Sequence, residues 1–175
     1  MKLKKTLAVI NQMQAAGVIG RYAIGGAVGA TFYLEPMATV DVDVFVAIHP
    51  EPGQLIATPK PIYDYLTARG CKTEGEYLVI EDWPVQFLPL MGPLVEEAIH
   101  EACDTIVEGE RTFVMTAEHL VAIALQTGRG KDKARILQFL EAGVLDQKRF
   151  QDVLRRHRLL DRWTRFEQQF LGGES

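Results

Sequence analysis

The chain has 175 residues, of which 47% are hydrophobic and 24% charged, and its formal net charge at pH 7 is −4. These values are typical of a globular protein and exclude an intrinsically disordered chain. No apolar run approaches the roughly 18 residues of a membrane-spanning helix, and no signal peptide is recognisable. Cys71 and Cys103 match neither a metal-binding spacing nor a disulfide framework, so we expect a cytoplasmic protein without a membrane partner.

The charge is distributed unevenly along the chain. Residues 1–110 carry a net charge of −8 and residues 111–175 a net charge of +4. Helix and strand patterns alternate in the first part, whereas the patterns from residue 116 onward are all helical. We therefore predict an α+β fold class, in which a small mixed or antiparallel sheet flanked by helices occupies residues 1–115 and a C-terminal helical region occupies residues 116–175.

The spacing of apolar residues, together with glycine and proline, predicts the elements in chain order. In the first part we expect helices at 4–16, 27–34, 61–69 and 94–101, and strands at 22–24, 40–48, 77–80, 85–88, 105–107 and 112–115. A hairpin turn is expected at 81–84. In the second part we expect helices at 117–126, 132–141, 147–157 and 160–170, with Thr116 as an N-cap.

Two aspartates lie on the strand expected at 40–48. Successive strand side chains point to opposite faces, so Asp41 and Asp43 share one face. Their Cα atoms should be roughly 6.5 to 7 Å apart, which allows both carboxylates to converge on Mg²⁺ or Mn²⁺, cations that prefer oxygen ligands. The alternative is an edge strand whose valines face the core while both aspartates face water.

A glycine pair precedes this strand. Gly25 and Gly26 end the short apolar run at 22–24 and begin the helix expected at 27–34. A strand, a turn and a helix start in this order leave backbone N–H groups near Ala27 free to donate to a phosphate. The glycines would let a phosphate approach the backbone closely.

On these residues the chain resembles the nucleotidyltransferase superfamily of the polymerase-beta type. The signature of that superfamily is a Gly-Gly or Gly-Ser turn, a short helix and an acid-x-acid strand, matched here by Gly25, Gly26, Asp41 and Asp43. The phrase Thr-x-Asp-x-Asp, which begins at Thr39, is similar to the branch that includes the AbiEii-type toxins.

A second motif extends the resemblance to most of residues 20–140. The helix expected at 117–126 is followed by Arg129-Gly130-Lys131-Asp132, which looks like the Arg-x-Lys-Asp motif of that branch. Considered without the resemblance, residues 128–133 also fit a solvated turn between helices that is capped by Asp132.

The resemblance implies a nucleotidyltransferase fold and the transfer of a nucleotidyl group from a nucleoside triphosphate (NTP) to RNA, a protein or a small molecule. It also implies a divalent metal and, for the AbiEii-like branch, a role in a toxin–antitoxin or phage-defence system with a cognate antitoxin protein as partner. No DNA readout motif is present. The implied metal ligands are Asp41 and Asp43, the implied catalytic residues are these two with Lys131 and Asp132, and the implied nucleotide-binding residues are Gly25, Gly26, Ala27, Thr39, Gln86 and Arg129.

Three features depart from the superfamily pattern, one of which is the absence of an arginine around Met37, before the Thr-x-Asp-x-Asp phrase. A third acid is expected on a later strand, where this chain has Gln86, and a helical lysine is expected where it has Ala124. An amide can contribute an oxygen ligand but neither a negative charge nor a base. Glu81 or Asp82 is an alternative third acid. The sequence therefore also allows a catalytically degenerate protein that binds nucleotides or a partner.

The last helices carry many cations interleaved with aromatic residues. Such a pattern fits contact with an RNA backbone and stacking on exposed bases. More commonly, such a pattern belongs to a solvated helix face whose aromatic side chains pack inward. The residues concerned are Lys148, Arg149, Arg155, Arg156, Arg158, Arg162 and Arg165, with Phe150, Trp163 and Phe166.

Overall fold

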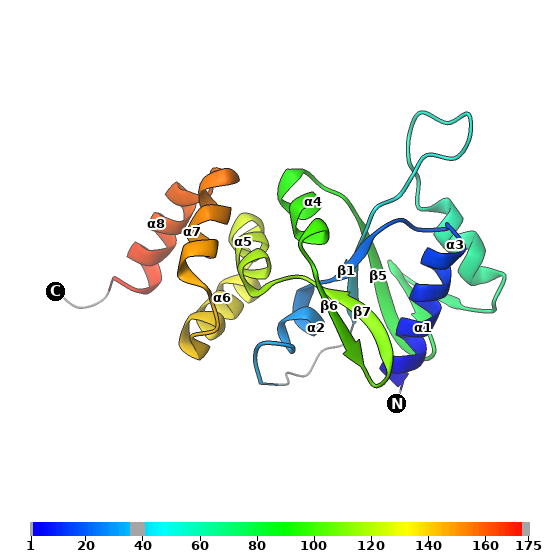
Figure 1. Cartoon of the computed structure of the whole chain (residues 1–175), viewed down its shortest axis with the longest axis horizontal. Helices are drawn as coiled ribbons and strands as arrows, with labels where there is room; N and C mark the ends of the chain where they lie inside the picture. Colours follow the sequence, from blue (N-terminus) through cyan, green and yellow to red (C-terminus); the bar gives the residue numbers. More distant parts are fainter. Residues whose placement is uncertain (1, 36–40, 173–175) are drawn as a thin grey trace. The chain divides into compact units, whose positions relative to one another are not determined.

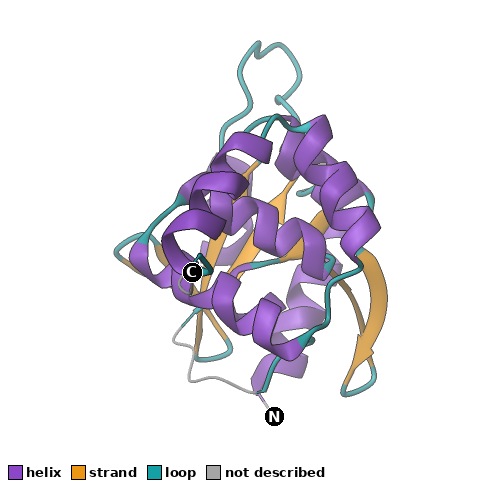
Figure 2. Cartoon of the chain, turned by 90° about the vertical axis from the view of Figure 1, so that its left-hand side faces the viewer, coloured by secondary structure: helices purple, strands orange, loops and turns teal. Residues whose placement is uncertain are grey.

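The computed structural model describes residues 2–35 and 41–172 (Figure 1). The chain divides into two compact units, residues 1–115 and 116–175. The first unit contains strands and helices, and the described part of the second contains helices only (Figure 2). None of the helices in the described ranges has the length and hydrophobicity that a bilayer-spanning helix needs.

Within the described residues, seven strands of the first unit form one mixed sheet in the order β3-β4-β5-β2-β1-β7-β6. The pairs β2–β5 and β1–β7 are parallel and the other neighbouring pairs are antiparallel. The strands are β1 (Tyr22–Ile24), β2 (Val42–Val46), β3 (Lys72–Glu74), β4 (Tyr77–Ile80), β5 (Trp83–Pro89), β6 (Cys103–Val107) and β7 (Glu110–Val114).

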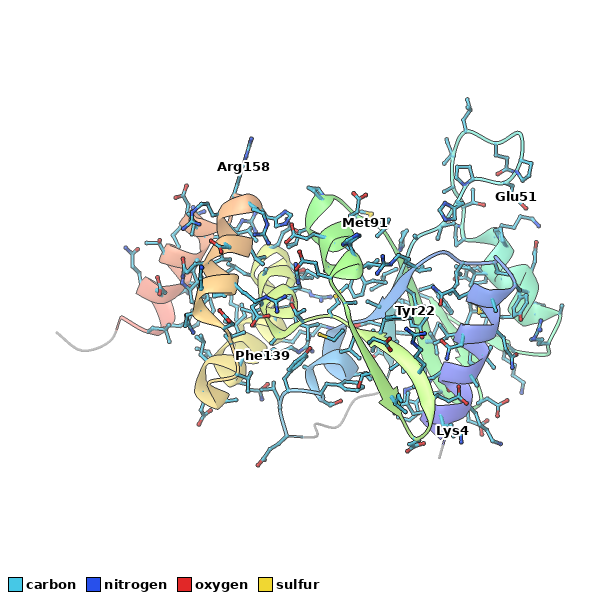
Figure 3. All side chains as sticks on the ribbon, viewed as in Figure 1. Lys4, Tyr22, Glu51, Met91, Phe139 and Arg158 are labelled. Atoms are coloured by element: carbon cyan, nitrogen blue, oxygen red, sulfur yellow. The ribbon has the colours of Figure 1, made fainter. Side chains whose placement is uncertain are left out.

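One face of this sheet holds the hydrophobic core of the first unit. Helices α1 (Lys2–Ala15) and α3 (Lys60–Thr67) pack there, as Figure 1 shows. Their buried side chains meet alternate residues of β2, β4 and β5. The fully buried Tyr22 lies among these groups (Figure 3), and its hydroxyl donates to Asn11 Oδ1 at 2.8 Å. The regular alternation of buried positions therefore fixes which residues point to the other face.

Two further helices belong to the first unit. Helix α2 (Gly26–Ala30) follows β1 directly, and α4 (Pro93–His100) follows β5. In Figure 1 both lie on the side of the sheet away from α1 and α3. The face opposite the main core is therefore covered by α2 and α4 only in part, and the half-buried residues of β2 lie on this face.

The second unit consists of four described helices, α5 (Ala117–Thr127), α6 (Gly130–Ala142), α7 (Gln147–Arg156) and α8 (Leu160–Phe170). Apolar residues from all four are buried, among them Phe139 of α6. Trp163 stands edge-on to Phe150 with ring centroids 4.9 Å apart. Phe150, Trp163 and Phe166 thus pack inward, as one of the two sequence interpretations expects.

The expected α+β class with a mixed sheet and a following helical region is confirmed. Most elements agree with the expected ranges to within a few residues. The strand β3 was not expected because its side chains are all exposed and polar. The helix expected at 27–34 was too long, because residues after Ala30 form a turn. The strand expected at 40–48 begins only at Val42 in the described residues.

Candidate functional site

The candidate site begins with the central strand β2. Val42, Val44 and Val46 are fully buried toward the main core, which leaves Asp43 on the opposite face, half-buried. Asp41, directly before the strand, is also half-buried. The alternative of an edge strand is wrong, because β2 lies between β5 and β1 in the sheet.

The Gly25-Gly26 turn lies directly against the side chain of Asp43. The Gly25 N–H donates to the backbone oxygen of Asp43 at 3.0 Å. Gly26 has a φ of +57°, and a Cβ placed on it would lie 1.8 Å from Asp43 Oδ2. A Cβ on Gly25 would lie 2.5 Å from Phe45 Cε2. Both positions therefore require glycine, and the carboxylate of Asp43 lies against the backbone of the turn.

Gln86 is the next member of the site. It pairs with Asp43 in the parallel register of β2 and β5, so the two side chains lie next to each other on the same face. Gln86, which replaces the expected third acid, therefore lies beside Asp43. A side-chain amide provides an oxygen ligand there, but no charge and no proton acceptor of carboxylate strength.

Glu81 does not supply the missing acid. Glu81 and Asp82 form a two-residue turn between β4 and β5 with φ values of +53° and +65°. The turn is tighter than the expected 81–84 because Trp83 and Pro84 belong to β5. The Glu81 carboxylate forms an ion pair with Lys5 Nζ at 3.8 Å, and Lys5 belongs to α1, which packs on the opposite face of the sheet.

Tyr77 is a residue of this face that the sequence analysis missed. It precedes Leu78, which pairs with Val85, so it lies across from Gln86 and on the same side of the sheet. The negative charge of Asp41 is the largest cause that raises the pKa of Tyr77, with smaller contributions from burial and other carboxylates. The alternation in residues 77–80 was the signal that could have identified it.

Two other predicted nucleotide-binding residues belong to the same region of the chain. Ala27 is in the first turn of α2, half-buried. Because α2 has only five residues, a phosphate would depend on individual N–H groups more than on a helix dipole. Thr39 lies outside the described residues.

The remaining predicted residues belong to the second unit. Gly128 ends α5 in a left-handed conformation, and Arg129 begins α6. Asp132 is 2% exposed and its Oδ2 accepts from the Arg129 backbone N at 3.2 Å and from Arg129 Nε at 2.7 Å. The structure therefore has the capped turn between helices that the sequence allowed. Lys131 is exposed beside it, and the catalytic role of this group stays a prediction.

The donors around β2 are chemically uniform. Asp41, Asp43 and Gln86 offer only oxygen ligands, the kind that a hard divalent cation prefers. The glycine turn leaves no side chain over Asp43. The residues present therefore fit a Mg²⁺ or Mn²⁺ ion, and the Asp43 carboxylate occupies the space that a side chain on Gly26 would fill.

No protein-family model matches the sequence, and a search of curated proteins gives no match. Solved structures do match. An antigenic nucleotidyltransferase-like protein from Paracoccidioides brasiliensis aligns with a TM-score of 0.53 at 13% identity, covering 95% of this chain and 92% of that chain.

The antibiotic-resistance factor ANT(2'')-Ia aligns as well. Its solution structure gives a TM-score of 0.54 at 14% identity, covering 97% of this chain and 98% of that chain. Its crystal structure in complex with adenylyl-2"-tobramycin gives 0.52 at 13% identity, covering 90% and 98%. At these identities the similarity establishes the fold, which is the nucleotidyltransferase fold.

Proposed function

We infer that the chain is a metal-dependent nucleotidyltransferase that moves a nucleoside monophosphate from an NTP to an acceptor hydroxyl and releases pyrophosphate. The observation that carries this proposal is the contact between the Gly25-Gly26 turn and the carboxylate of Asp43 on the central strand. The nucleotidyltransferase fold shared with the matched solved structures supports the same proposal.

The residues of the site have distinct roles in this proposal. Asp41 and Asp43 hold the divalent cation, and Gln86 contributes an amide oxygen beside Asp43. Gly25 and Gly26 admit the phosphates to the backbone, and the N–H of Ala27 donates to them. When bound, the cation neutralises charge on the triphosphate, which is the main requirement of phosphoryl-group chemistry.

Other roles are carried by residues outside the strand site. Arg129 would contact a phosphate through its guanidinium and Lys131 as a point charge. Asp132 accepts three hydrogen bonds from Arg129 and thereby positions it. Thr39 completes the proposed nucleotide-binding residues. These assignments rest on the resemblance of residues 129–132 to the Arg-x-Lys-Asp motif.

The acceptor is proposed as RNA, a protein or a small molecule. The crystal structure of ANT(2'')-Ia contains an adenylylated small molecule, and this favours a small-molecule hydroxyl. The cytoplasmic location, the AbiEii-like branch, the toxin–antitoxin or phage-defence role and the antitoxin partner are further proposals that rest on the sequence and its resemblance.

A second candidate function is a nucleotide-binding or partner-binding module without turnover. The position of Gln86 beside Asp43 favours it, because the third acid of the superfamily pattern is absent from this strand. A nucleotide-binding module would share the nucleotide site with the enzyme and differ from it only in transfer. A transfer assay with α-labelled NTPs separates them once binding is established.

The experiment that tests the proposed site is a melting-temperature series. The wild type and an Asp41→Asn/Asp43→Asn variant are measured with each NTP, with and without Mg²⁺ or Mn²⁺. A ligand at about 100 times its dissociation constant stabilises the fold by about 2.7 kcal/mol. Stabilisation that requires the metal and disappears in the variant is the expected result. Equal melting temperatures with every NTP would overturn the proposal.

A further inference from the structure

A pocket of about 320 Å³ lies within the helical unit, formed by residues of α5, α6 and α8 and by Gly128. Its volume is at the lower end of the range for small-molecule sites. Its wall combines apolar and cationic side chains, which are Leu125, Ile136, Phe166, Lys133, Arg162 and Arg165. All of these residues belong to the second unit.

The charged side chains that line this pocket are all positive. Three cations and no carboxylate line it among the described residues. Arg162 is held in place because its Nη1 donates to the Gln126 backbone oxygen at 2.7 Å. Arg165 is exposed and pairs with no residue in the described ranges. Clustered cations without a counter-charge favour an anionic ligand, and guanidinium groups match phosphate oxygens in geometry.

Aromatic rings form the adjoining wall. Phe166 is buried and stacks on Trp163, with ring centroids 5.5 Å apart and planes inclined by 13°. Phe170 leans on Phe166 at 4.9 Å and remains 38% exposed, with Lys133 Nζ 5.6 Å from its ring centroid. An exposed ring on a fixed aromatic support offers a stacking surface for a planar group.

We propose that this pocket binds a nucleoside monophosphate unit. The phosphate lies at Arg162, Arg165 and Lys133, and the base lies against Phe170. Two sources have this chemistry, a free nucleotide and the end of a single-stranded RNA. The pocket is a ligand site of the helical unit, so its occupancy requires neither a metal nor Asp41 and Asp43, and it does not depend on the proposed function.

The test is a calorimetric titration of the full chain in EDTA, which removes divalent cations from the strand site. The probes are adenosine and uridine 5′-monophosphate, inorganic phosphate, and a short single-stranded RNA with a terminal phosphate. Arg165→Gln removes one proposed phosphate contact. Arg158→Gln is the matched control, because Arg158 is exposed, does not line the pocket and points away from the helices (Figure 3).

The expected result is binding of a mononucleotide or of the RNA end, weakened about tenfold or more in Arg165→Gln and unchanged in Arg158→Gln. Binding of the RNA alone would identify the strand end as the source. Inorganic phosphate binding as tightly as the nucleotides would overturn the role of Phe170. Absent binding, or equal binding by Arg165→Gln, would overturn the proposal. If Arg165→Gln does not fold, Phe170→Ala provides the second variant.

Discussion

Gly26→Ala tests the packing of the glycine turn against Asp43. Gly26 has a φ of +57°, in the left-handed region, and its added Cβ would lie 1.8 Å from Asp43 Oδ2 and 2.7 Å from Cγ. No pair of atoms tolerates these distances, so the Asp43 side chain must leave its position. The substitution therefore acts on the proposed metal ligand itself.

The energetic cost has three parts. The left-handed conformation costs alanine about 1–2 kcal/mol, and displacement of a side chain from its rotamer costs about 0.5–1.5 kcal/mol. The reduced freedom of the unfolded chain offsets about 0.4–1 kcal/mol. The expected net loss of unfolding free energy is about 2 kcal/mol, which lowers the melting temperature of a chain of this size by about 4–8 °C.

Gly17→Ala is the matched control. Gly17 has a φ of +72° and nothing lies within 4 Å of its added Cβ, so only the backbone cost applies. Urea unfolding of both variants should show that Gly26→Ala is less stable than Gly17→Ala by about 1 kcal/mol. Asp43→Ala should remove most of this difference when combined with Gly26→Ala. Equal stabilities of the two glycine variants would refute the packing described for Asp43.

Three further measurements concern Gln86, Tyr77 and Tyr22. Gln86→Glu should lower the melting temperature without metal, because it places another carboxylate beside Asp43. If the site is catalytic, the substitution should raise the rate of nucleotidyl transfer by about a hundredfold. Transfer of label from α-labelled NTPs measures this rate, and an unchanged rate would favour the binding module. The pKa of Tyr77 should fall toward its ordinary value in Asp41→Asn and in the wild type saturated with Mg²⁺, because the charge of Asp41 is the largest cause that raises this pKa. An NMR titration of labelled tyrosine rings measures the pKa, and Tyr77→Phe identifies the Tyr77 signal. Burial raises the pKa of Tyr22, so the contribution of this side chain to stability is complete below about pH 10 and is lost as pH rises through the folded-state pKa. The free energy of unfolding, measured across this range, should therefore fall less steeply with pH in Tyr22→Phe than in the wild type. Equal slopes would contradict this explanation.

Much of the fold could be predicted from local patterns. The apolar strand at residues 22–24 and the N-cap at Thr116 are recognisable from neighbouring residues in the sequence. The position of β2 at the centre of the sheet could not be predicted, because it follows from pairing with β5, some 40 residues later in the chain. The exposed strand β3 also depends on its partner β4 more than on its own residues.

In the candidate site, too, local patterns predicted some features, whereas others depend on the pairing of distant strands. The alternation of residues 40–48 correctly placed Asp43 on the face away from the core valines, and Asp41 directly precedes β2. Tyr77 was missed because its relation to Gln86 depends on the register of β4 and β5. The close contact of Gly26 with Asp43 Oδ2 depends on the tertiary structure, although the sequence indicated that a glycine was needed there.

Broadening of amide NMR signals by Mn²⁺ in the presence of an NTP tests directly whether metal and nucleotide bind beside β2. A paramagnetic ion broadens the signals of nearby nuclei. We expect the signals of Gly25, Gly26 and Gln86 to disappear first and that of Gly17 to be less affected. The Asp41→Asn/Asp43→Asn variant should lose the effect. Broadening that is unchanged in this variant, or that begins elsewhere in the chain, would contradict the assignment of this strand as the metal and nucleotide site.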